Sequence, residues 1–233
     1  AETIKTAGYT TAHFGKYQSG GSLNNSPTDQ GFDFNYGGDS DGAPGSYFAA
    51  SSGGNWEFHP RIGPELDVYA DPYTSAESLA LAGDNSLTGT AKHVTDALGD
   101  AAIDFMNDNN NSPFFMHFIN YAIHGPWGQA NARPDLYAKY VAKNNTNPSQ
   151  IGHDNVAQAA ILEGMDQTIG RIVDYLKTTP DPRNPGNMMS ANTLVYFISD
   201  NGGANGPEDN TPLKGMKGEY TEGGIRSVTF AWS

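Results

Sequence analysis

The sequence predicts an α/β protein with a mostly parallel sheet and helices on both faces. Two long segments, residues 90–108 and 156–176, repeat apolar residues at three- and four-residue steps, as amphipathic helices do. Short apolar runs at 114–119 and 194–198 lack that period and are typical of strands buried on both faces. Strands and helices that alternate in this order form parallel sheets.

The first part of the chain predicts a helix, a tight turn and a strand. Residues 1–7 carry helix formers and end at Gly8, which tolerates positive φ, and residues 9–14 are β-branched and aromatic. Residues 18–55 are rich in Gly, Ser, Asn and Asp, so we expect surface loop there rather than core structure.

The later elements follow the same logic. Helix 90–108 carries an acidic face with Asp96, Asp100, Asp104 and Asp108, which we expect to be solvated because like charges four residues apart repel each other. A last strand, residues 228–232, closes the predicted order of elements.

Length and charge exclude several classes of protein. The 233 residues fit one large domain, and 13 Lys and Arg against 26 Asp and Glu give a net charge of −13, which disfavours nucleic-acid binding. The chain has no Cys, so it has no disulfide, zinc–thiolate site or cysteine nucleophile. No apolar run reaches the roughly 20 residues of a membrane span.

Charged and polar residues follow the predicted strands where ligands bind in parallel sheets, beyond the carboxyl ends. Asp200 and Asn201 offer hard oxygen ligands for Ca²⁺ or Mg²⁺, and His124 can donate to an anion or protonate a leaving group. Lys16 and Lys217 could clamp a tetrahedral dianion. Taken singly, each has an ordinary explanation as a turn, a loop histidine or a surface lysine.

Taken together, these segments resemble the type I sulfatases of the alkaline-phosphatase superfamily. The resemblance rests on residues 7–16, 124–126, 198–203 and 214–226. It implies an alkaline-phosphatase-like fold and hydrolysis of sulfuric esters. It also implies roles for individual residues: Lys16, His124 and Lys217 would be catalytic and bind sulfate, Gln18 would contact substrate, and Asp200 and Asn201 would be two of the calcium ligands, with Mg²⁺ as the alternative metal.

Two features depart from the family pattern. The sequence contains no Cys/Ser-x-Pro-x-Arg segment, from which the family makes its formylglycine nucleophile, and the nearest string is Ser26-Pro27-Thr28-Asp29. Gln18 stands where the family usually has a histidine, and an amide cannot act as a base. We therefore expect residues 1–233 to be one partial sulfatase catalytic domain, truncated at both ends and inactive alone, with the formylglycine supplied from upstream.

Two other functions stay open. One is a phosphate- or phosphonate-ester hydrolase of the same superfamily, and the other is a degenerate domain that binds anionic glycans without cleaving them, which Gln18 favours. A sulfated carbohydrate is a candidate substrate, for which aromatic residues could supply flat binding faces: Tyr47, Phe48, Trp56, Phe58 and Trp127.

The remaining expectations concern location, assembly and the other histidines. The resemblance implies a periplasmic or secreted protein. An incomplete sheet would expose an apolar edge or face through which the fragment could dimerise. We expect the histidines outside the candidate site to be structural or solvated, namely His13, His59, His93, His117 and His153.

Overall fold

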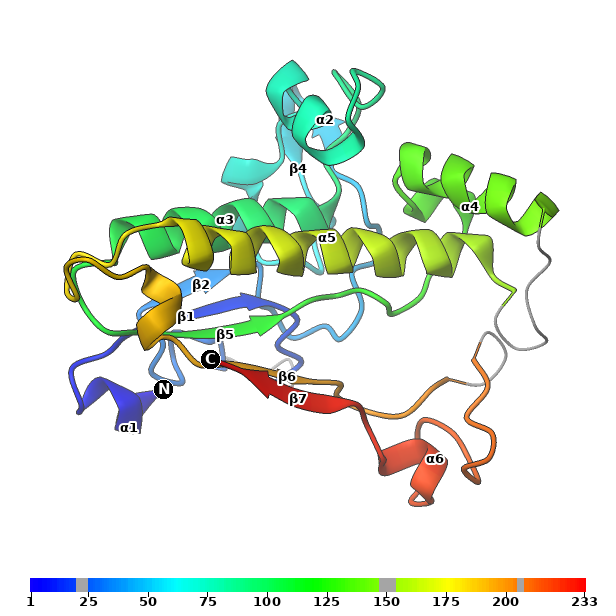
Figure 1. The fold of residues 1–233 in the computed structure, drawn as a ribbon. Coiled ribbons are helices and arrows are strands. Elements are labelled where there is room, and N and C mark those ends of the chain that lie inside the picture. Colours follow the sequence, from blue (N-terminus) through cyan, green and yellow to red (C-terminus); the bar gives the residue numbers. More distant parts are fainter. Residues whose placement is uncertain (20–24, 147–153, 205–207) are drawn as a thin grey trace.

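The structure is a computed structural model and describes residues 1–19, 25–146, 154–204 and 208–233 (Figure 1). His153 and its expected role lie outside these ranges. The helices are α1 (Glu2–Lys5), α2 (Ser75–Ala82), α3 (Val94–Asp108), α4 (Pro134–Thr146), α5 (Val156–Thr178) and α6 (Glu222–Ile225). The strands are β1 (Thr10–Gly15), β2 (Phe34–Tyr36), β3 (Ala50–Ser52), β4 (Asn55–Glu57), β5 (Phe114–Ile119), β6 (Val195–Ile198) and β7 (Thr229–Trp232).

The central sheet is parallel, as the sequence predicts. Its strands run in the order β2-β1-β5, and β1 pairs with β5 from Thr10↔Phe114 to Gly15↔Ile119. β2 lies within the segment for which we predicted only surface loop, and this prediction is wrong. Three residues are too short to show a period, and Phe34 and Tyr36 are held in the sheet by pairing with β1.

The long helices α3 and α5 pack together over one face of the sheet (Figure 1). Phe14 of β1 is fully buried there, with its ring 4.9 Å from the stacked ring of Tyr36 and 5.7 Å from that of Phe105 on α3. The small side chains of Ala97, Ala101 and Ala102 line the buried face of α3 and let the helix approach the sheet closely. The short helix α1 lies on the other side, near the start of β1 (Figure 1).

The start and the acidic face of α3 differ from the sequence prediction. The helix begins at Val94 rather than near residue 90, because the imidazole of His93 caps it by accepting a hydrogen bond from the backbone N–H of Thr95. Asp96 is not solvated but buried, and it accepts hydrogen bonds from the Tyr73 hydroxyl and the Arg133 guanidinium. A carboxylate can be buried when cationic and hydroxyl donors replace water in this way.

The last two strands are not joined to the central sheet by hydrogen bonds within the described part of the chain. β6 pairs only with β7, and the two strands are antiparallel. Side chains on one face of β6 are largely open to solvent, with Leu194, Tyr196 and Ile198 being 70%, 61% and 56% exposed. The apolar face that we expected is therefore present, whereas the prediction that residues 194–198 form a strand buried on both faces is wrong, because no described element covers this face of β6. The mostly parallel sheet with helices is confirmed as the fold class, while the terminal pair is an antiparallel departure from it.

Within the ranges that the structure describes, no helix is long and apolar enough to cross a membrane.

Candidate active site

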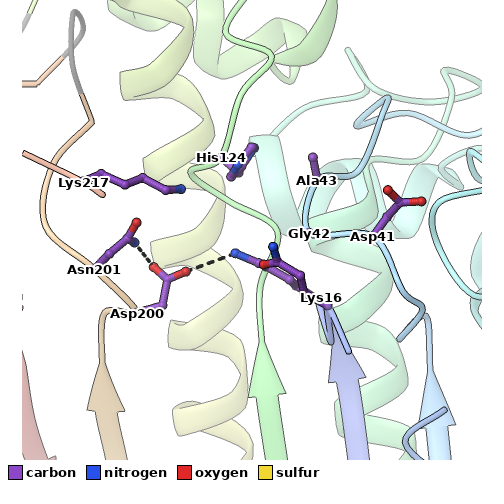
Figure 2. A pocket seen from close by; sticks show the side chains of 9 residues that line it. Lys16, Asp41, Gly42, Ala43, His124, Asp200, Asn201 and Lys217 are labelled. Carbon is purple, nitrogen blue, oxygen red and sulfur yellow. Dashed lines mark hydrogen bonds and ion pairs between the residues drawn. The ribbon is translucent and has the colours of Figure 1, made fainter. Parts of the chain in front are cut away.

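A cavity of about 430 Å³ opens at the carboxyl ends of β1, β5 and β6 (Figure 2). All six residues that the sequence singles out for the site line this cavity: Lys16, Gln18, His124, Asp200, Asn201 and Lys217. Residues 41–43, from the loop after β2, complete the lining. These residues cannot be predicted from the sequence, because this Gly-rich loop has no period and no motif. The chemical role of each lining residue stays a prediction.

Lys16 is placed by a close approach of two backbones at the end of β1. Gly15 has a φ of +82°, and a Cβ there would lie 2.1 Å from the carbonyl oxygen of Ile119. Only glycine fits, and the chain then turns so that the N–H of Lys16 donates to that same carbonyl at 2.9 Å. The Lys16 side chain is only 14% exposed, and its Nζ lies 3.1 Å from Oδ2 of Asp200.

Asp200 and Asn201 follow β6 directly. Partial burial by itself would raise the pKa of Asp200, but the hydrogen bond from Lys16 and the charges of Lys16 and Lys217 outweigh it and lower the pKa. The carboxylate is therefore ionised at neutral pH. The Asn201 amide N–H donates to its other oxygen, as Figure 2 shows.

His124 is held by buried tyrosines in the turn after β5. The hydroxyl of Tyr47 is shared between the carbonyl oxygens of Tyr121, at 3.0 Å, and His124, at 2.6 Å. The hydroxyl of Tyr121 in turn donates to the carbonyl of Gly37 at 2.8 Å. Burial raises the pKa of both phenols, so both remain donors at any physiological pH. The turn that carries His124 is thus tied to the loop after β2.

The ring of His124 has one nitrogen available to a ligand. Its Nδ1 lies 2.9 Å from the carbonyl oxygen of Gly125. A carbonyl only accepts, so the hydrogen-bond network assigns a hydrogen to Nδ1. Nε2 is then the nitrogen that can exchange a proton with a ligand in the cavity.

Lys217 is positioned through Asn210, which the sequence analysis did not single out. The Asn210 amide donates to the carbonyls of Gly203 and Gly215 at 3.0 and 3.2 Å, and its oxygen accepts from the N–H of Gly203 at 3.0 Å. The N–H of Lys217 also donates to the Gly203 carbonyl, at 2.9 Å. The segment carrying Lys217 therefore lies beside the turn that follows Asn201. No local pattern around Asn210 indicates this role.

Gln18 adopts a left-handed backbone, with a φ of 54°. Its N–H donates to the carbonyl of Asp39 at 3.0 Å, which supports the unusual conformation. Its side chain lies against Gly42, where a Cβ would come within 2.5 Å of the Gln18 amide carbon. Gln18 therefore joins the end of β1 to the loop that forms the opposite wall of the cavity.

Two of the aromatic residues considered for carbohydrate binding are excluded by burial. Tyr47 is fully buried and Phe58 is only 6% exposed, so neither offers a face to a ligand. Among the other histidines, His13 and His117 lie on neighbouring strands with their Nδ1 atoms 3.0 Å apart. Burial, reinforced by its neighbour His117, lowers the pKa of His13 to about 4, and burial also lowers the pKa of His117. Both are neutral structural residues at pH 7.

The side chains that line the cavity can bind an oxyanion and supply part of a metal site. The ammonium groups of Lys16 and Lys217 and the imidazole of His124 converge on one cavity (Figure 2), a combination suited to an anion with several oxygens. Asp200 and Asn201 supply oxygen ligands of the kind that calcium prefers. Over the ranges that the structure describes, no three His, Asp or Glu side chains are grouped to hold a metal ion.

Fold and cavity together define an α/β protein with a pocket lined by lysine, histidine and aspartate side chains at the carboxyl ends of its strands. The family model that matches the chain is described as sulfatase and covers residues 1–233. The chain therefore belongs to the sulfatase family, as the resemblance indicates.

Similar proteins agree with this assignment. A sulfatase from Formosa agariphila is 37% identical over 246 residues, which cover 97% of this chain and 42% of that protein. Human N-acetylgalactosamine-6-sulfatase is 27% identical, with 99% of this chain and 38% of that protein covered. The chain thus spans about two fifths of the length of these relatives. The solved structure of Ps i-CgsB in complex with k-i-k-neocarrahexaose has the same fold, with a TM-score of 0.59 at 24% identity, covering 96% of this chain and 44% of that one.

Proposed function

We propose that the cavity binds the sulfate group of a sulfuric ester, and that the protein to which this chain belongs hydrolyses that ester to an alcohol and sulfate. One observation carries the proposal. Lys16, His124 and Lys217 are far apart in the sequence but line one cavity, in a chain of the sulfatase family. Their side chains supply the positive charge and the hydrogen-bond donors that a tetrahedral dianion needs.

In this proposal Lys16 and Lys217 bind and orient the sulfate oxygens. His124 binds through Nε2 and, when protonated, can give that proton to the oxygen that leaves as an alcohol. Its Nδ1 keeps the ring fixed by donating to the Gly125 carbonyl. Asp200 holds Lys16 in place when no ligand is bound.

Two groups that the family implies complete the proposal. We propose that Asp200 and Asn201 bind Ca²⁺, or Mg²⁺ in its place. The ionised carboxylate and the amide oxygen fit such an ion, but they supply only two of the about six to eight oxygens that calcium takes. When present, a formylglycine would supply the nucleophile for sulfur. These 233 residues contain no Cys/Ser-x-Pro-x-Arg segment from which to make one, and Ser26 does not line the cavity.

Sulfate titration of the 233-residue protein tests the proposal. We expect the wild-type chain to bind inorganic sulfate, and Lys217→Met to weaken binding by about tenfold, since a hydrogen bond to a charged group contributes about 1.5–3 kcal/mol. Lys214→Met is the matched control, because Lys214 is exposed in the same segment and does not line the cavity. The proposal is wrong if the two variants weaken sulfate binding equally or if the wild-type chain binds no sulfate.

Gln18 favours a second function, the binding of anionic glycans without cleavage. Its amide lies in the cavity at the position where the family resemblance places a histidine, and it cannot take up a proton there. Gln18→His in the longer protein distinguishes the two functions. A gain of ester hydrolysis would support the binding function for the natural sequence, whereas hydrolysis by the unchanged protein would exclude it.

We further propose a sulfated carbohydrate as the substrate, which the names of the N-acetylgalactosamine-6-sulfatases and the neocarrahexaose complex support. The periplasmic or secreted location and dimerisation through the exposed face of β6 stay predictions.

A further inference from the structure

We propose that Asp41, with Arg61 beside it, determines specificity by accepting a hydrogen bond from a hydroxyl group of the sugar that carries the sulfate. This inference rests on the proposed function. It gives a role to the wall of the cavity that lies opposite Lys217 and Asn201. Figure 2 shows Asp41 across the cavity from Lys217 and Asn201.

The chemistry of Asp41 separates its role from sulfate binding. An ionised carboxylate has oxygens that only accept hydrogen bonds, and so has a sulfate group. The two repel each other, so Asp41 favours poses that keep sulfate near Lys16 and Lys217. What Asp41 can bind is a donor on the rest of the substrate.

The neighbouring side chain of Arg61 affects which substrate group, a hydroxyl or an ammonium, binds better to Asp41. Its Nε lies 3.8 Å from Oδ1 of Asp41, and both side chains are about half exposed, at 49% and 48%. The guanidinium offsets part of the carboxylate charge, so a substrate ammonium gains less there than it would from an isolated carboxylate. A neutral hydroxyl group can still donate to Asp41, which lines the cavity, whereas Arg61 does not line it.

The loop that carries Asp41 is fixed with respect to Lys16. Before Asp41, the Tyr121 hydroxyl holds the Gly37 carbonyl at 2.8 Å, and Gln18, two residues after Lys16, holds the Asp39 carbonyl at 3.0 Å. After Asp41, Gly42 packs against the amide end of the Gln18 side chain. The loop that carries Asp41 is therefore held by the same segment after β1 that carries Lys16. A binding residue held in place by its neighbours can discriminate between substrates.

The size of the cavity fits a ligand larger than sulfate. Its volume of about 430 Å³ lies within the range of small-molecule pockets, roughly 300–1,000 Å³. A sulfate held by the two lysines leaves space toward Asp41 for a sugar ring. The substrate class that these features favour is a sulfated monosaccharide unit with free hydroxyl groups.

Calorimetric titration of the 233-residue protein tests the inference with two kinds of ester. Ethyl sulfate carries the ester but no hydroxyl group, and the comparison ligands are the 4- and 6-sulfates of galactose and of N-acetylgalactosamine. We expect at least one sugar sulfate to bind more tightly than ethyl sulfate. Asp41→Ala should lower the affinity for that sugar sulfate by at least about tenfold and change the affinity for ethyl sulfate by less than about twofold.

Asp39→Ala is the control, because Asp39 lies in the same loop but its side chain does not line the cavity. Three results would overturn the role of Asp41. Asp41→Ala could weaken the binding of both ligands equally, the two variants could have equal effects, or the wild-type chain could show no preference for any sugar sulfate. Those results would leave the sulfate site intact if ethyl sulfate still binds. Failure of the wild-type chain to bind any of these ligands or inorganic sulfate would overturn the proposed function as well.

Discussion

Removing one hydroxyl group from the core should weaken sulfate binding, although that hydroxyl does not line the cavity. Tyr47→Phe keeps the buried ring, which stacks on His93 at 5.1 Å, but deletes the donor to the carbonyls of Tyr121 and His124. The Tyr121 carbonyl retains the N–H of His124 at 2.9 Å, so only the His124 carbonyl loses its donor.

The loss of stability follows from the one carbonyl that is left without a donor. One buried acceptor left without a partner lowers the free energy of unfolding by about 1–3 kcal/mol. Because the lost bond fixes the residue that presents Nε2 to the cavity, we also expect sulfate affinity to fall by about fivefold, or roughly 1 kcal/mol. Urea unfolding measures the first effect and sulfate titration of the folded variant measures the second.

Tyr69→Phe is the matched control. The Tyr69 hydroxyl donates to Asp104 at 3.2 Å, and Tyr69 does not line the cavity. It should cost less stability and leave sulfate affinity unchanged. If Tyr47→Phe loses stability but binds sulfate as tightly as the wild type, Tyr47 does not position His124 for sulfate binding.

Three further predictions concern stability. Burial lowers the pKa of His13 to about 4 in the folded chain, against about 6.5 when unfolded, so the unfolded state binds more protons between these values. His13 alone should therefore lower stability by about 3 kcal/mol as pH drops from 7 to 4, and His93, whose pKa burial also lowers to about 4, should add to this fall. A urea midpoint that does not fall with pH would contradict this. Arg133→Met leaves the buried Asp96 without its cation and should cost about 3–5 kcal/mol in urea unfolding, whereas a loss below about 1 kcal/mol would show that the pair is not buried in solution. Gly15→Ala should abolish the native circular dichroism spectrum because its Cβ meets the Ile119 carbonyl, while Gly170→Ala, on α5 with open space around it, should fold; equal stability of the two would contradict the close approach.

Some features of the fold and site could be predicted because they follow from local patterns. The apolar runs that become β5 and β6 show the strands directly in the sequence, and the spacing of apolar residues along α5 shows its buried face. Burial of the strands is not predictable in the same way, because β6 leaves one face open to solvent. The rule that ligands bind beyond the carboxyl ends of parallel strands then brings Lys16, His124 and Asp200 together.

Other features depend on partners distant in the sequence. Asp96 has the same helical spacing as the exposed Asp104 and Asp108, and only the contacts with Arg133 and Tyr73 make its burial favourable. β2 becomes a strand because β1 presents a free edge to three residues of a Gly-rich segment. Asp41 lines the cavity from a loop that Gln18 and Tyr121 hold, and neither contact leaves a periodic trace in the sequence.

Crystals of the 233-residue protein soaked in selenate would show whether the cavity binds an oxyanion, because selenate has the shape and charge of sulfate and an anomalous signal that locates it. We expect an anomalous peak within hydrogen-bonding distance of Lys16 Nζ, Lys217 Nζ and His124 Nε2. The cavity is not a sulfate site if it stays empty in crystals that bind selenate elsewhere, or if the peak persists in Lys217→Met but is lost in Lys214→Met.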